Sequence, residues 1–256
     1  MYLKRISKII APFTPLLILY LIMIIGFAPD GLVADEGRYI GYAENLVKGY
    51  YADSDNPSIR NGPGYPLVIY LPVLFKTAHM FLRLLNLLFI TIALVYFFKT
   101  LCFYITKKHA LILCYAFGLY PPLVRGITGI LSETFAILLV CGFVYHFIKI
   151  FNSNDKTKKN VAFASLFIGG LALTKFLFGY VIVSLLLGSL FILIFNREGK
   201  VRLGFVTMLL GFSFCLPYLA YTYSVTGKMF LWGTQGGEML YWRSTPFENE
   251  YGDWIS

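Results

Sequence analysis

Charged residues are scarce in this sequence, and their scarcity excludes an ordinary soluble domain. Only 14% of the 256 residues are Asp, Glu, Lys or Arg, against about a quarter in an average soluble domain. The mean hydropathy is +0.70, and the apolar residues come in long blocks rather than short amphipathic stripes. We therefore predict an all-α integral membrane protein, because helices satisfy their own backbone hydrogen bonds inside a bilayer.

Clusters of cysteine or histidine are also missing. The four cysteines lie singly inside apolar blocks, and the three histidines are scattered: Cys102, Cys114, Cys141, Cys215, His79, His109 and His146. None has the spacing of a disulfide framework or a metal site. We interpret the cysteines as small apolar residues that face lipid or other helices.

The apolar blocks that are present predict about seven transmembrane helices. They lie at residues 9–28, 80–105, 109–124, 132–150 and 203–223, with two short tilted helices in 161–195 that turn near Lys175. The block "YPLVIYLPVLF" at 65–75 is too short to span and contains two prolines, so we expect it to dip into the membrane or lie on its surface. The domain prediction is a transmembrane domain over 1–223, followed by an outer-face segment over 224–256.

The basic residues indicate which loops lie inside. With a cytoplasmic N-terminus, the inner loops hold 13 of the 22 basic residues and only two of the 13 acids, Asp155 and Glu198. This asymmetry follows the positive-inside rule and accounts for the basic composition. Because membrane topology already explains the excess of basic residues, we do not expect the protein to bind nucleic acid.

The first outer loop, 29–64, concentrates acidic residues. Within it, Tyr39, Tyr42, Ala43, Leu46 and Tyr50 recur at helical spacing, which predicts an amphipathic helix on the outer membrane surface. Asp35 and Glu36 would open this helix, where its dipole favours anions. Two readings of the loop stay open: Asp35 is an N-cap with Arg38 solvated, or Asp35 is a functional carboxylate.

Two further outer elements bring charge toward the same leaflet. Arg125 and Glu133 flank the start of the fourth span, and Lys175 lies at the next outer turn. Ionisable residues at the edge of the hydrocarbon are costly and are usually paired or functional. We expect a pocket that holds an anion and a carboxylate base. "DSD" at 53–55 and "GGEML" at 236–240 lack the strand and helix context of nucleotide or phosphate sites.

The ordered segments resemble a known family. "DEGRY", "IRNGPGYPLVIYLPVLF", "GILSETFAILL" and "GGLALTKFLFGYV" are similar to segments of membrane glycosyltransferases of the C-type (GT-C) fold. The nearest branch holds the dolichyl-phosphate-mannose protein mannosyltransferases and the bacterial aminoarabinose transferases of lipid A. This chain ends at "GDWIS", where family members continue with further spans, so we expect a fragment, a truncated product or a short variant.

The resemblance assigns roles to particular residues. It implies Asp35 as the catalytic base, with Glu36 beside it holding the loop or a partner in place. Where aminoarabinose transferases carry Lys-Pro before the second span, this chain has "NGPGYP", and we take Arg60 as the substitute. The expected phosphate-binding residues are Arg38, Arg60 and Lys175, and the expected pocket and acceptor residues are Tyr39, Tyr65, Arg125 and Glu133.

The implied reaction moves a sugar from a polyprenyl phosphate to an acceptor glycan, lipid or protein at the outer face, with inversion. The implied location is a bacterial inner membrane. No cofactor is expected; a metal reported in some relatives needs a His that has no match here. Two other functions stay open: a transporter or flippase for a lipid-linked sugar, and a non-catalytic membrane subunit or truncated paralogue.

Overall fold

The computed structural model describes residues 9–53, 57–152, 157–195 and 199–251. Every regular element within them is a helix: η1 (Ala11–Phe13), α2 (Thr14–Phe27), α3 (Glu36–Val47), α4 (Gly64–Leu74), α5 (His79–Leu101), α6 (Lys107–Gly118), α7 (Pro121–Gly126), α8 (Glu133–Asn152), α9 (Thr157–Thr174), α10 (Leu177–Phe195), α11 (Gly199–Ser213), α12 (Leu216–Thr226), α13 (Gln235–Ser244) and η2 (Glu248–Glu250). Several residues used in the charge argument lie outside the described residues: Lys4, Arg5, Lys8, Asp55, Asp155, Lys156, Arg197 and Glu198.

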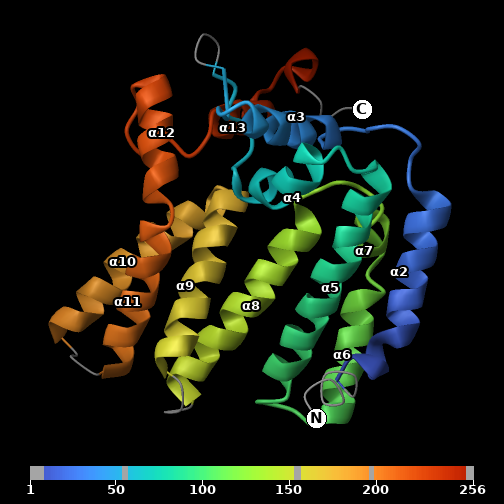
Figure 1. Ribbon diagram of the computed structural model, residues 1–256. Coiled ribbons are helices and arrows are strands. Elements are labelled where there is room, and N and C mark those ends of the chain that lie inside the picture. Colours follow the sequence, from blue (N-terminus) through green and yellow to red (C-terminus); the bar gives the residue numbers. More distant parts are fainter. Residues whose placement is uncertain (1–8, 54–56, 153–156, 196–198, 252–256) are drawn as a thin grey trace.

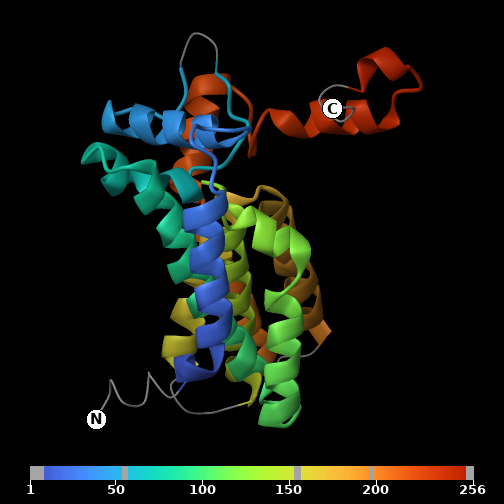
Figure 2. The same cartoon turned by 90° about the vertical axis from the view of Figure 1, so that its right-hand side faces the viewer.

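The long helices run alongside one another as a bundle with two distinct ends (Figure 1). Helices α3, α4 and α13 lie across one end, which also holds residues 121–133 and 174–177; we call it the loop end. The opposite end holds the α5–α6 turn and the facing ends of α8 and α9; we call it the basic end. Figure 2 shows α13 extending away from the bundle at the loop end.

The structure confirms an all-α protein with apolar helices suited to a membrane. By length and hydropathy, α5, α8 and α10 can each cross a bilayer, and the pair α11 and α12 adds a fourth crossing if it counts as one bent span. Helices occupy all seven predicted places, but α6 has only 12 residues and α2 with η1 is also short. Seven crossings and a cytoplasmic N-terminus therefore stay predictions.

Prolines explain where helix boundaries differ from the prediction. The predicted span 109–124 divides at residues 119–120 into α6 and α7, and Pro121 begins α7. The predicted span 203–223 bends by 41° between α11 and α12, where Pro217 lies in the first turn of α12. Proline supplies no backbone N–H and clashes with the preceding turn, so it is tolerated best in the first turn of a helix, where Pro121 and Pro217 lie. The predicted turn near Lys175 is confirmed between α9 and α10.

The apolar face of α3 corrects one expectation. It was predicted to lie on the membrane, but Tyr39, Tyr42 and Ala43 are buried inside the protein against α4 and neighbouring loops. Tyr39 packs edge-on against Tyr65, and Tyr50 lies beyond the end of the helix. Helix α3 is therefore held at the loop end by protein contacts.

Small residues let α9 and α11 approach closely. A Cβ on Gly169 would lie 2.7 Å from the carbonyl oxygen of Gly211, so neither position has room for a larger side chain. Small residues commonly allow such contacts between membrane helices. Helix α8 packs between α5 and α9, and the bundle as a whole supports the loops that carry the charged residues.

Candidate functional site

Asp35 lies immediately before α3, at the loop end. It occupies the N-cap position but makes no side-chain cap hydrogen bond. Instead its Oδ1 lies 2.7 Å from Nη2 of Arg38, one turn further along the helix. The Asp35 side chain is 44% exposed, so the carboxylate group is accessible from solvent.

Glu36, the neighbouring residue, has the opposite environment. Its side chain is 1% exposed, and Oε2 lies 3.2 Å from Nη2 of Arg83, which is 4% exposed. The carboxylate also accepts hydrogen bonds from the backbone N–H groups of Val33 and Ile130, while Arg83 donates to the carbonyl of Gly31. Glu36 therefore joins α3, the loop before it and the 127–131 segment to α5.

A chain of hydrogen bonds leads from Arg38 into the protein. Arg38 Nη1 donates to Asn61 Oδ1 at 3.1 Å, Asn61 Nδ2 donates to the hydroxyl of Tyr39 at 3.2 Å, and that hydroxyl lies 2.7 Å from Ser132 Oγ. Burial raises the pKa of Tyr39 to about 12, so its hydroxyl stays protonated at neutral pH. This chain connects the first loop to the residue that precedes α8.

Two glycines hold Asn61 in position. A Cβ on Gly62 would lie 1.8 Å from the carbonyl oxygen of Leu173, and one on Gly64 would lie 2.3 Å from Oγ1 of Thr174. The loop can therefore lie directly on the α9–α10 turn because it carries glycine there. Tyr51 adds a hydrogen bond from its hydroxyl to the backbone carbonyl of Asn61, at 2.7 Å.

Lys175 and Glu133 form an ion pair at the loop end. Lys175 Nζ lies 2.8 Å from Glu133 Oε1, and both side chains are partly exposed. Glu133 directly follows Ser132 in the chain. The negative charges of Glu133 and Asp35 both contribute to raising the pKa of Tyr39. The structure thus brings together five of the predicted site residues: Asp35, Arg38, Tyr39, Glu133 and Lys175.

The other predicted residues lie around this group in different settings. Arg60 precedes Asn61 but points into a separate ion pair, with Nη2 3.1 Å from Oε1 of Glu238 in α13. Tyr65 is buried beneath Tyr39, and its hydroxyl has no hydrogen-bond partner among the described residues. Arg125 is exposed on α7. Among the described residues it forms no ion pair with Asp35, whose carboxylate pairs with Arg38.

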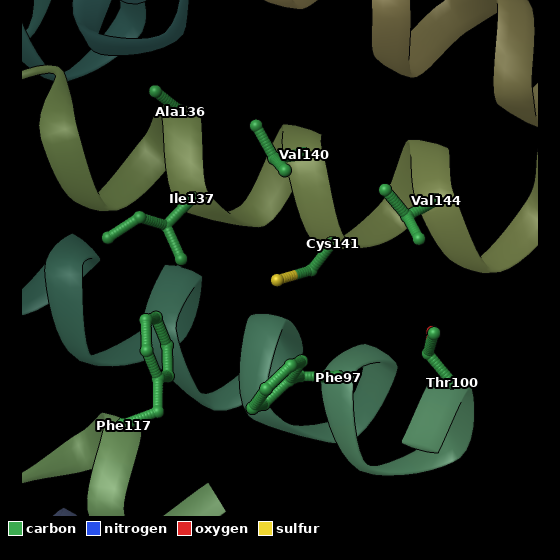
Figure 3. Close-up of a pocket in the computed structure, with 8 residues that line it drawn as sticks. All are labelled: Phe97, Thr100, Phe117, Ala136, Ile137, Val140, Cys141 and Val144. Carbon is green, nitrogen blue, oxygen red and sulfur yellow. The ribbon is translucent and has the colours of Figure 1, made fainter. Parts of the chain in front are cut away.

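One cavity lies beside these residues and another lies within the helix bundle. One of about 460 Å³ opens between the 29–36 loop and residues 122–131, and Glu36 and Arg125 line it. Another of about 390 Å³ lies between α5, α6 and α8, where its apolar lining includes Phe97, Phe117 and Cys141 (Figure 3). The second cavity contains none of the predicted site residues.

Metal-ligating side chains are not grouped in the described residues. No set of three or more His, Cys, Asp or Glu side chains there could hold a metal ion. All three predicted phosphate-binding cations are engaged by carboxylates: Arg38 by Asp35, Arg60 by Glu238 and Lys175 by Glu133. A phosphate at this end would share or displace these carboxylates.

Sequence reasoning missed four residues that organise this end. Arg83 neutralises Glu36, Asn61 and Ser132 complete the hydrogen-bond chain, and Glu238 pairs with Arg60. An arginine inside an apolar block was a usable signal for Arg83, because such a charge needs a partner. Asn61 and Ser132 carried no comparable signal, since both are common loop residues.

A known protein structure has a fold similar to that of this chain. The structure is similar to a chain of the S. cerevisiae protein O-mannosyltransferase Pmt1-Pmt2 complex bound to the sugar donor, with a TM-score of 0.63 and 16% sequence identity. The match covers 90% of this chain and 35% of that chain, so this chain spans about a third of that protein's length. At this identity the likeness concerns the fold alone. Neither a protein-family model nor a curated protein matches the sequence.

Proposed function

We propose that this chain is a membrane glycosyltransferase that moves a sugar from a polyprenyl phosphate to an acceptor hydroxyl at the loop end of the bundle. The observation that carries the proposal is the contrast between Asp35 and Glu36. Asp35 is 44% exposed with one cation beside it, whereas Glu36 is 1% exposed and fully engaged. Of these two neighbouring carboxylates, Asp35 is the one available to a substrate. The likeness of the fold to a protein O-mannosyltransferase also supports the proposal.

Asp35 acts as the general base in this proposal. As the acceptor oxygen forms its bond to the anomeric carbon, its proton passes to the free oxygen of Asp35. The bond between the anomeric carbon and the phosphate oxygen breaks on the opposite side of the sugar, so the configuration inverts. Arg38 orients Asp35 through their 2.7 Å contact.

The leaving group is a lipid phosphate, and its developing charge needs cationic donors. Lys175 and Arg38 suit this role because both are partly exposed and each retains N–H groups beyond those in the observed contacts. Arg60 assists from the α13 side. The donor's polyprenyl tail enters from the bilayer, while the concentration of basic residues at the other end supports an outward-facing site.

The test measures transfer of radiolabel from polyprenyl-phosphate sugars by membranes containing the full chain, in detergent and in sealed vesicles. We expect Asp35→Asn to lower transfer by about 10²–10⁴-fold, the usual contribution of a general base. The matched control is Asp30→Asn, which removes an exposed acid from the same loop and leaves transfer unchanged. Lys175→Ala should raise the KM for donor.

Three results would contradict the proposal. Near wild-type transfer by Asp35→Asn would remove Asp35 as the base. Donor movement across sealed vesicles without any product in detergent would indicate a transporter. Absence of transfer with every donor, from stably expressed wild-type chain, would indicate a non-catalytic subunit.

A further inference from the structure

The ion pair between Glu133 and Lys175 joins the start of α8 to the turn between α9 and α10. Glu133 is the first residue of α8, and Lys175 follows the last residue of α9. Nζ of Lys175 lies 2.8 Å from Oε1 of Glu133, and the two side chains are 34% and 53% exposed. Because both partners are accessible from outside the protein, an anion can approach the ammonium group that the carboxylate now contacts.

Close backbone contacts link the turn that carries Lys175 to the hydrogen-bond network of Arg38. Arg38 donates a hydrogen bond to the side chain of Asn61. A Cβ on the next residue, Gly62, would lie 1.8 Å from the carbonyl oxygen of Leu173, and Lys175 lies two residues beyond Leu173. The two cations proposed to bind the donor phosphate are therefore connected through one tightly packed segment, although they are far apart in the sequence.

Glu133 is also connected to the loop that carries the proposed base. Oγ of the preceding residue, Ser132, lies 2.7 Å from the hydroxyl of Tyr39, and Tyr39 is in the first turns of α3, just after Asp35. A phosphate held by Lys175 in this place would meet the Glu133 carboxylate directly, since that carboxylate contacts the same ammonium group. The repulsion between them grows in proportion to the negative charge of the phosphate.

The donor and the spent carrier of the proposed reaction differ in this charge. The donor is a phosphodiester with one negative charge, whereas the polyprenyl phosphate left after transfer is a monoester with about 1.5 to 2 negative charges at pH 7. A lysine alone would bind the monoester more tightly than the diester, so the spent carrier would occupy the site. A carboxylate that competes for the same lysine opposes both ligands, and it opposes the monoester more strongly.

We infer that Glu133 determines specificity between donor and spent carrier: it competes with the lipid phosphate for Lys175 and lowers the affinity for the monoester more than that for the diester. The observed 2.8 Å contact is the competing state. An incoming phosphodiester displaces the carboxylate from Lys175, and the carboxylate returns as the monoester leaves after transfer. This inference rests on the proposed function for the placement of the phosphate at Lys175.

The experiment measures binding rather than transfer, by native mass spectrometry of the full chain purified in detergent at low ionic strength. The probes are undecaprenyl phosphate, a monoester, and its methyl ester, a diester with the same tail and a single charge. We expect Glu133→Gln to tighten binding of the methyl ester about fivefold, the effect of one unit charge at about 4 Å in water. Binding of undecaprenyl phosphate should tighten at least about tenfold, because its charge is larger. The matched control, Glu44→Gln, removes the same charge from an exposed position on α3 and should leave both affinities unchanged.

A double variant separates competition for Lys175 from general repulsion of anions. Lys175→Gln should weaken binding of both probes. When Glu133→Gln is added to Lys175→Gln, it should tighten binding much less than it does in the wild-type chain, because the carboxylate no longer has an ammonium group to occupy. Circular dichroism in the same detergent checks the helices of each variant, and an exposed ion pair contributes little to stability.

Specific outcomes would overturn the inference. It fails if Glu133→Gln leaves binding unchanged or weaker, if both probes gain equally, or if Glu44→Gln tightens binding as much. Equal tightening with and without Lys175 would show that Glu133 only repels anions. If Lys175→Gln itself leaves binding of both probes unchanged, the phosphate does not lie at Lys175, and that part of the proposed function fails as well. A normal effect of Lys175→Gln with no effect of Glu133→Gln overturns this inference alone.

Discussion

The buried pair of Glu36 and Arg83 supports a sharp prediction about stability. Three N–H groups point at the Glu36 carboxylate, from Arg83, Val33 and Ile130. Glu36→Gln preserves the size of the side chain but replaces one acceptor oxygen with an NH2 group that must face a donor. It also leaves the 4% exposed Arg83 without a counter-ion.

The expected cost of Glu36→Gln is about 3–5 kcal/mol in free energy of unfolding, the range for breaking one side of a buried ion pair. Asp35→Asn, one residue earlier, breaks a partly exposed pair and should cost about 0–1 kcal/mol. The double variant Glu36→Leu/Arg83→Met should cost less than the sum of its single variants, because it leaves no isolated charge.

Unfolding in mixed micelles of increasing SDS content, followed by circular dichroism, measures these differences. Asp35→Asn is the control for a charge change in the same loop, and its normal stability is also required for the transfer assay. The reasoning is refuted if Glu36→Gln and Asp35→Asn lose equal amounts of free energy of unfolding. It is also refuted if the loss in the double variant equals the sum of the losses in its two single variants.

Two further predictions concern the loop end. Gly62→Ala places a methyl group against the carbonyl of Leu173 and should cost about 1–3 kcal/mol in the same unfolding assay; Gly188→Ala, which has open space, should cost nothing, and an equal effect of both would contradict the close contact. Tyr39→Phe removes the hydrogen-bond partner that the Tyr39 hydroxyl provides to Ser132 Oγ and to Asn61 Nδ2, and it should cost about 1–3 kcal/mol, whereas Tyr50→Phe at an exposed position should be neutral. Unchanged stability of Tyr39→Phe would show that the hydrogen-bond chain is not structural.

Much of the architecture was predictable because it depends on local composition. Long apolar blocks determine helices in a membrane, and the length of block 161–195 with Lys175 near its middle predicted the turn between α9 and α10. The block at 65–75 was expected to be too short to span, and the structure makes it the short helix α4, Gly64–Leu74. The helical spacing of Tyr39, Tyr42 and Ala43 predicted α3. Whether that face contacts lipid or protein was not predictable, because amphipathic spacing is the same in both cases.

The candidate site was likewise predictable from the sequence only in part. The sequence by itself determined that acids collect in one loop and bases in others, since charge distribution along the chain needs no folding to be read. Only the tertiary structure distinguished two adjacent carboxylates: Arg83, 47 residues further along the chain, lies against Glu36 and not against Asp35. Such pairings depend on how distant helices pack, and no local pattern records which of two neighbouring side chains a buried cation will contact.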